Sequence, residues 1–134
     1  MTRRTRGIAI GIAAMLATAA GAQEARAPSL AALKSVETGR WQIHEIGTKG
    51  RDRAVCVRDP QRLLQMRHPG QRCARFVIDD TPNLATVHYT CPGAGHGRST
   101  LKVEAPGLID IQTQGLAGGL PFDARYEARR QGGC

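Results

Sequence analysis

Apolar and polar residues alternate along most of the chain after about residue 37, and this period of two predicts β-strands. In GRWQIHEIG, Trp41 and Ile43 share one face of an extended segment, and Gln42 and His44 share the other. The segment FDARYEARR near the end of the chain alternates most clearly. Its inward positions are expected to be Phe122, Ala124, Tyr126 and Ala128.

Turn-forming residues separate the alternating segments. The strands expected from the pattern lie in GRWQIHEIG, RAVCV, FVI, VHYT, STLKVEA, LIDIQTQ and FDARYEARR. Most of the links are short and rich in glycine, proline or aspartate: TKGRD, DDTPN, the flexible turn PGAGHGR, Pro106-Gly107 and the loop GLAGGLP. Strands joined by short links run antiparallel. We therefore expect a mainly β fold, an antiparallel meander of about seven strands, curled or closed into a small barrel.

Two stretches favour helix instead of strand. Ser29 is placed to cap a short helix in LAALKSV that ends near Gly39. In DPQRLLQM, Asp59 is a good N-cap and Pro60 a good first helical residue, and the leucines give the helix an apolar side. This second stretch is the one helix expected to be inserted within the meander.

The first residues have the order of a secretory signal peptide. Three arginines are followed by an uncharged apolar run and then by the small residues Ala20-Gly21-Ala22. The run is shorter than the roughly 20 residues that a spanning helix needs, although an uncleaved anchor is the alternative. We expect a signal peptide at 1–22, a leader and short helix at 23–36, and one β domain at 37–134. No later segment is apolar enough to cross a membrane.

The charge changes this picture little. The chain carries a formal charge of +8, and cleavage after Ala22 would remove three arginines and lower it to +5. A nucleic-acid partner is not expected for an exported protein. Weak attraction to anionic polymers or lipid headgroups of the envelope is compatible with the basic surface.

The four cysteines, Cys56, Cys73, Cys91 and Cys134, all follow the expected cleavage site. An even number in a small exported domain predicts disulfides and therefore a periplasmic location. Zinc is the competing interpretation, but zinc sites use short paired spacings that are absent here. We expect no metal.

The sequence between Cys73 and Cys91 helps to choose among the three possible pairings. Its centre, 79–83, contains turn formers, and β-favouring residues flank it on both sides. A hairpin there brings its two ends together, which predicts the pair Cys73–Cys91 and leaves Cys56–Cys134. Cys56 would point to the opposite face from Val55 and Val57, so either the strand carries a bulge or this bridge lies on the outer face.

Several of these features together resemble a known family. They are Gly39-Arg40-Trp41 opening a strand, a cysteine-bearing strand, a helix that starts Asp-Pro, Tyr-Thr-Cys at 89–91 and Ala-Arg-Arg-x-Gly-x-Cys at 128–134. Residues 37–134 resemble the bacterial envelope proteins grouped as domain of unknown function 3617. The resemblance implies an exported, disulfide-bonded, β-rich domain and no particular reaction. The chain departs from the family in having few methionines and Thr38-Gly39 before the tryptophan.

No catalytic grouping is recognisable. The cysteines are expected to be oxidised, and no serine lies in a Gly-x-Ser-x-Gly elbow. The candidates for acid–base chemistry near neutral pH are His44, His68, His88 and His96. Two of them lie on polar strand faces, His68 suits a cap at a helix end, and His96 lies in a glycine-rich turn. We expect no catalytic residue and no cofactor, and a hydrolytic enzyme is the weakest alternative.

A binding or accessory module of the periplasm is the stronger hypothesis. A small curled sheet can hold a small apolar ligand in its mouth, or present a face to an envelope partner. If the aromatic residues fill the interior, recognition must fall to an outward surface, or the protein is a structural or assembly factor of the envelope. The candidate ligand-binding residues, for which a place in the core is the alternative, are Trp41, Tyr89, Phe122 and Tyr126.

Overall fold

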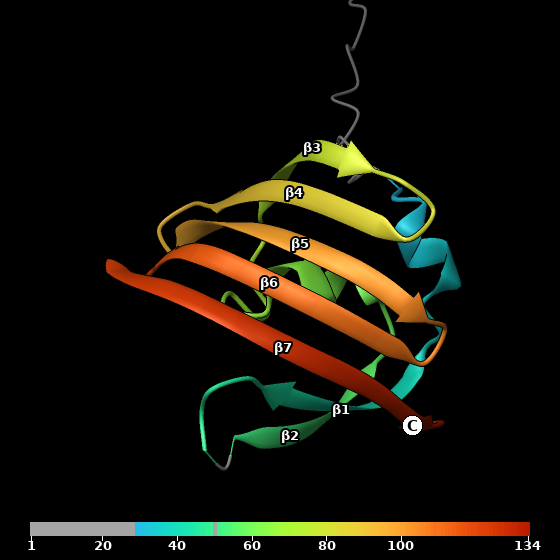
Figure 1. Cartoon of the computed structure of the whole chain (residues 1–134). Helices are drawn as coiled ribbons and strands as arrows, with labels where there is room; N and C mark the ends of the chain where they lie inside the picture. The colour runs from blue at the N-terminus through green and yellow to red at the C-terminus, as the bar shows by residue number, and fades with distance from the viewer. Residues whose placement is uncertain (1–28, 50) are drawn as a thin grey trace, which may run out of the picture.

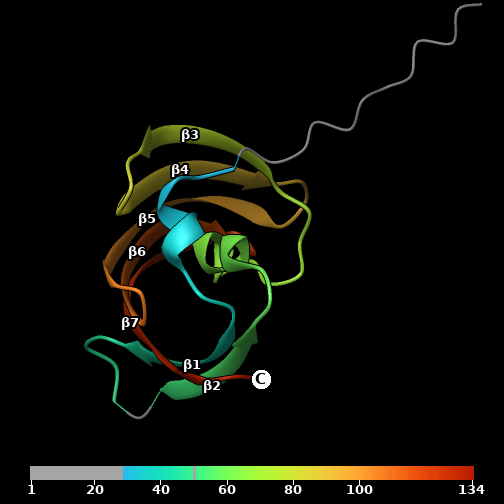
Figure 2. The same cartoon turned by 90° about the vertical axis from the view of Figure 1, so that its right-hand side faces the viewer.

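The computed structural model describes residues 29–49 and 51–134. Seven strands form one sheet, and two short 3-10 helices, η1 and η2, lie inside its curve (Figures 1 and 2). In chain order the elements are η1 (Ala32–Ser35), β1 (Gly39–Glu45), β2 (Asp52–Val57), η2 (Pro60–Gln65), β3 (Ala74–Asp80), β4 (Leu84–Cys91), β5 (Gly95–Ala105), β6 (Leu108–Ala117) and β7 (Leu120–Gly132). The expected signal peptide and the leader up to residue 28 lie outside the described residues.

The strand order is β2-β1-β7-β6-β5-β4-β3, with every neighbouring pair antiparallel. The predicted meander is confirmed from β3 to β7, and β7 then pairs with β1 (Figure 1). The prediction of a closed barrel is wrong. Strands β2 and β3 are the two edges of the sheet, because the chain between them turns inward to form η2 and does not make a hairpin.

The hairpin turns are tighter than the glycine-rich sequences suggest. Gly118 and Gly119 alone connect β6 to β7, with φ of +57° and +80°. Two-residue hairpin loops favour positive φ, which glycine adopts without steric cost. His96, expected in a flexible turn, lies in β5, since that strand already begins at Gly95. Pro106-Gly107 makes the predicted turn between β5 and β6.

Both predicted helices are present as 3-10 helices. The side chain of Asp59 accepts a hydrogen bond from the Gln61 backbone N–H at 3.0 Å, which confirms it as the cap of η2. The prediction that Ser29 caps η1 is wrong: the residue before η1 is Ala31, and its N–H donates to Asp80 Oδ1 at 2.8 Å. The start of η1 is therefore held by β3.

The core lies between the concave face of the sheet and the two helices. The predicted inward residues Trp41 and Ile43 are buried, as are Ala124, Tyr126 and Ala128, whereas Phe122 remains partly exposed. Leu64 of η2 is fully buried against this face. The helices thus supply apolar surface that a sheet with few aromatic residues lacks.

All four cysteines are paired as predicted, Cys73 with Cys91 and Cys56 with Cys134. The β1–β2 register has no shift, and Cys56 is exposed, so that bridge lies on the outer face of the sheet. Two disulfides are typical of an oxidising environment outside the cytoplasm. Among the described residues, no helix has the length and apolarity needed to cross a bilayer.

Candidate functional site: an arginine-lined groove beside β2

The open side of the sheet contains two adjoining hollows, of about 560 and 400 Å³. They share the residues Ile43, Arg53 and Met66, and so form one continuous depression. Strands β1 and β2 make one wall, and η2 with the segment leading to Arg75 makes the other. We call this depression the β2 groove.

The groove has apolar side chains along its length. Val57, Leu63 and Met66 are buried members of the core that reach its surface, and Val55 packs beside them half-buried. An apolar strip of this kind can hold the apolar part of a ligand, since covering it removes further hydrocarbon surface from water. Deep insertion is blocked, because the interior behind the strip is filled by Trp41 and Leu64.

Five arginines line the groove as well: Arg51, Arg53, Arg62, Arg67 and Arg75. None of them forms an ion pair with a carboxylate within the described part of the chain. The acidic residues beside them are Glu45, Asp52 and Asp59, two of which already have partners. Asp59 accepts from the Gln61 N–H, and Asp52 pairs with His44. The groove therefore has an excess of unneutralised positive charge.

Arg75 is the most enclosed of the five. Its guanidinium donates to the backbone oxygen of Gln61 at 3.1 Å, to the side-chain oxygen of Gln65 at 2.7 Å and to that of Gln61, all neutral acceptors. Its Nε–H is buried and has no hydrogen-bond partner among the described residues. Burial lowers the pKa of Arg75 below its ordinary value, while Asp59 and Tyr89 act in the opposite direction. A half-buried cation held only by neutral groups would gain from a nearby anion.

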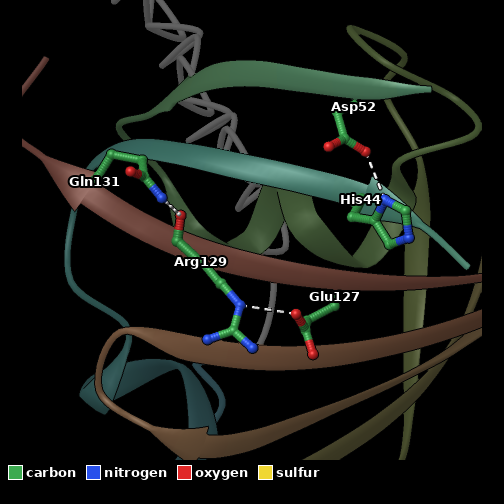
Figure 3. Close-up of polar contacts among 5 residues, drawn as sticks. All are labelled: His44, Asp52, Glu127, Arg129 and Gln131. Carbon is green, nitrogen blue, oxygen red and sulfur yellow. Dashed lines mark hydrogen bonds and ion pairs between the residues drawn. The ribbon is translucent and has the colours of Figure 1, made fainter. Parts of the chain in front are cut away.

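The outer face of β1, β2 and β7, on the other side of the sheet from the groove, is arranged differently (Figure 3). There His44 of β1 contacts the carboxylate of Asp52 on β2, and Arg129 of β7 donates to Glu127 at 2.8 Å. The side chain of Gln131 donates to the backbone oxygen of Arg129. The cations drawn in Figure 3 each contact a carboxylate, whereas the groove arginines have no carboxylate partner among the described residues.

The four aromatic residues proposed as ligand contacts do not line one common surface. Trp41 is fully buried, and its Nε1–H donates to the Glu37 backbone oxygen at 3.0 Å. Tyr89 is also fully buried, while Tyr126 is 3% exposed and reaches the smaller hollow. Phe122 is partly exposed beneath the guanidinium of Arg67, 5.3 Å from the ring centre.

The histidines are dispersed. His68 is buried, where its Nδ1 meets the Tyr89 hydroxyl at 3.0 Å and its Nε2 meets the Ala94 oxygen at 3.2 Å. It therefore joins η2 to the sheet. His88 and His96 lie side by side on β4 and β5, with ring centres 5.7 Å apart. Among the described residues there is no cluster of three or more side chains that could hold a metal ion.

The groove arginines were not among the residues expected from the sequence to form a site. A local signal exists: alternation places Arg53 on the same face as Val55 and Val57, and Arg75 on the same face as Val77. A charged residue at an inward position of a strand is unusual and marks a position to examine. The convergence of these arginines depends on the path of η2, which alternation does not reveal.

The chain was also compared with known proteins. No family model, no curated protein and no solved structure matches it.

Proposed function

We propose that this protein is an exported binding module, acting in the periplasm, whose ligand is elongated, partly apolar and negatively charged and lies in the β2 groove. The observation that supports this most directly is the set of five groove arginines, which have no carboxylate partner within residues 29–49 and 51–134. The adjoining valines, leucine and methionine offer the apolar part of such a ligand a surface to cover. The two disulfides suit a module that works outside the cytoplasm.

Because the interior is filled by side chains, we infer that the ligand lies in a surface groove and is not enclosed inside the sheet. Trp41, Tyr89 and Leu64 occupy the space that a carrier for a wholly apolar molecule would keep open. Negative charge on the ligand is the natural complement of the groove, because it would neutralise arginines that have no carboxylate partner in the part of the chain that the structure describes. The resemblance to the envelope family fits the same role, and we propose membership of it on that basis.

The test is an NMR titration of the oxidised protein with simple anionic probes. We would use dodecanoate and an acetylated, amidated hexapeptide of alternating valine and glutamate, each beside a neutral counterpart, dodecanol and the valine–glutamine hexapeptide. At least one anionic probe should shift amide resonances of 52–57 and 61–66, and its affinity should fall as salt is added. Absence of shifts with both anionic probes, or shifts confined to the outer face, would contradict the proposal.

Matched double variants sharpen the result. Arg53→Gln with Arg62→Gln removes two exposed groove charges, and Arg40→Gln with Arg98→Gln removes two exposed charges from the outer face. The first pair should lower the affinity for the anion at least tenfold, and the second should change this affinity less than twofold. Equal losses in both would mean that only the net charge of the protein is sensed.

A further inference from the structure

The free edge of β2 faces the groove with unused backbone groups. Strand β2 pairs with β1 in an unbroken register from Gly39↔Val57 to His44↔Asp52. Within the described residues, 52–57 make no backbone hydrogen bond other than those to β1. An antiparallel strand uses about half of its N–H and C=O groups for each neighbour, so the other half of those in β2 point to the open side.

The opposite edge of the opening is less suited to pairing. Strand β3 has a register shift between Val77 and Asp79, which bends the strand and disturbs its pattern of donors and acceptors. The guanidinium of Arg75 is anchored there by two glutamines. Bulges are among the devices that protect sheet edges from association. Because β2 has a regular backbone, it is the edge that remains available.

The side chains beside this edge favour a linear ligand with charge along its length. The arginines occupy both hollows: Arg62 and Arg75 line the larger, Arg51 and Arg67 the smaller, and Arg53 lies where the two meet. A single-headed amphiphile needs a cluster of charge at one end and an apolar tunnel at the other. A groove with charge distributed over two hollows instead matches an extended chain whose alternate side chains enter it.

We propose that the occupant of the β2 groove is an extended, acidic polypeptide segment that adds to the free edge of β2 as an eighth strand. This inference rests on the proposed function and specifies its ligand. Backbone hydrogen bonds to β2 supply affinity that does not depend on the ligand's sequence. Alternate side chains of the added strand enter the groove, and acidic ones at these positions contact the arginines with their carboxylates and cover Val55 and Met66 with their methylene groups.

A second copy of this protein is the competing occupant of a free edge, since exposed edges of identical chains can pair. The charges oppose it. Pairing two β2 edges would bring Arg53 of each copy, with the other groove arginines, close to the same set on its neighbour. Like charges across an interface are repulsive and select against that partner.

The experiment compares three probes against the whole, disulfide-bonded protein by calorimetry. The probes are the valine–glutamate hexapeptide, the same peptide N-methylated at alternate residues on its pairing edge, and dodecanoate. N-methylation removes the N–H donors but keeps the side chains. We expect the unmodified peptide to bind at least tenfold more tightly than either other probe. Hydrogen exchange of the free-edge amides of 52–57 should slow only when the unmodified peptide is present.

A charge-reversed pair of exposed groove residues tests the side-chain part. The double variant Arg53→Glu, Arg62→Glu should no longer bind the valine–glutamate peptide. It should bind a valine–lysine hexapeptide at least tenfold more tightly, whereas the unaltered protein should show the opposite preference. The N-methylation comparison needs no altered protein, so it stands even if this variant folds poorly.

The outcomes separate this inference from the proposed function. Equal binding of the methylated and unmodified peptides, or tight binding of dodecanoate alone, would overturn strand addition and leave an anion-binding groove. If none of the anionic probes binds, both strand addition and the proposed anion-binding function are overturned. A dimer in sedimentation velocity with slowed exchange at 52–57 would assign the edge to a second copy and overturn the peptide proposal.

Discussion

Strands β5, β6 and β7 differ from β2 and β3 in what surrounds their backbones. Each of the first three pairs along both sides, and most of their inward side chains are buried. Strands β2 and β3 pair on one side only and border the groove. One side of the molecule is therefore held by continuous hydrogen-bonded ladders, and the other needs a different means of stabilisation.

Both disulfides are found on the side with fewer hydrogen bonds. Cys56 ties β2 to Cys134, just beyond β7, and Cys73, directly before β3, is tied to Cys91 at the end of β4. Each bridge fastens one of the two edge strands to a strand of the fully paired part. The comparison indicates that covalent links hold the opening at a set shape where the sheet lacks a ladder.

The largest expected effect tests this reinforcement. In the chain-entropy model, removing Cys56–Cys134, with a separation of 78 residues, costs about 4.5 kcal/mol of unfolding free energy, and removing Cys73–Cys91, with a separation of 18, costs about 3 kcal/mol. Both losses are large for a small domain. The paired serine variants should be compared by urea denaturation, and a reduced protein as stable as the oxidised one would contradict the role of the bridges.

Hydrogen exchange of the same variants sharpens the comparison. Loss of Cys56–Cys134 should accelerate exchange in β2 before it does so in β5 or β6. Uniform acceleration throughout the sheet would mean that the open and fully paired sides form one cooperative unit.

A smaller effect is expected from overpacking the fully paired side. A methyl group on Gly97 of β5 would lie 2.5 Å from the hydroxyl oxygen of Tyr89, whose ring is fully buried. Gly97→Ala should therefore lower the unfolding free energy by roughly 1–3 kcal/mol. Gly107→Ala is the matched control, because its nearest contact would be an ordinary 3.6 Å. Thermal denaturation measures both, and equal melting temperatures would show that the Tyr89 ring can move aside.

The smallest effect concerns the link between η2 and the sheet. Burial raises the pKa of Tyr89 above its usual value of 10.0. As the pH rises through 10, the unfolded chain releases this proton first, so the folded state should lose stability. Tyr89→Phe should flatten that decline, while costing about 1 kcal/mol at neutral pH through the lost hydrogen bond to His68.

Urea midpoints between pH 8 and 11 measure the alkaline decline. Tyr126→Phe is the control for this series, because it retains Tyr89 and should retain the decline. If the two variants respond alike, ionisation of Tyr89 is not its cause.

Local patterns were sufficient to predict the strands, most of the turns and both disulfides. Alternation reveals which side chains share a face, and the turn formers at 79–83 bring Cys73 and Cys91 together without any long-range information. The pairing of β1 with β7 is different, because it joins residues far apart in the chain and leaves no local signal. The open edge has the same origin, since it depends on η2 turning inward.

The candidate site was less predictable for a related reason. The aromatic residues were chosen by type, yet Trp41 and Tyr89 serve as core because their surroundings close over them. Arg53 and Arg75 come from separate strands and meet only through the tertiary fold. Likewise Ser29 looked like a helix cap, but Asp80 from β3 supplies the acceptor. In each case a distant residue outweighed a local preference.

The position of β7 between β1 and β6 has a consequence for how the chain is made. Glu45 pairs with Tyr126 and Arg40 with Gly132, so β1 gains its second neighbouring strand only after β7 has been synthesised. Until β7 is in place, Trp41 and Ile43 have no partner strand on the β7 side to help bury them, so the chain exposes apolar surface that the finished sheet covers.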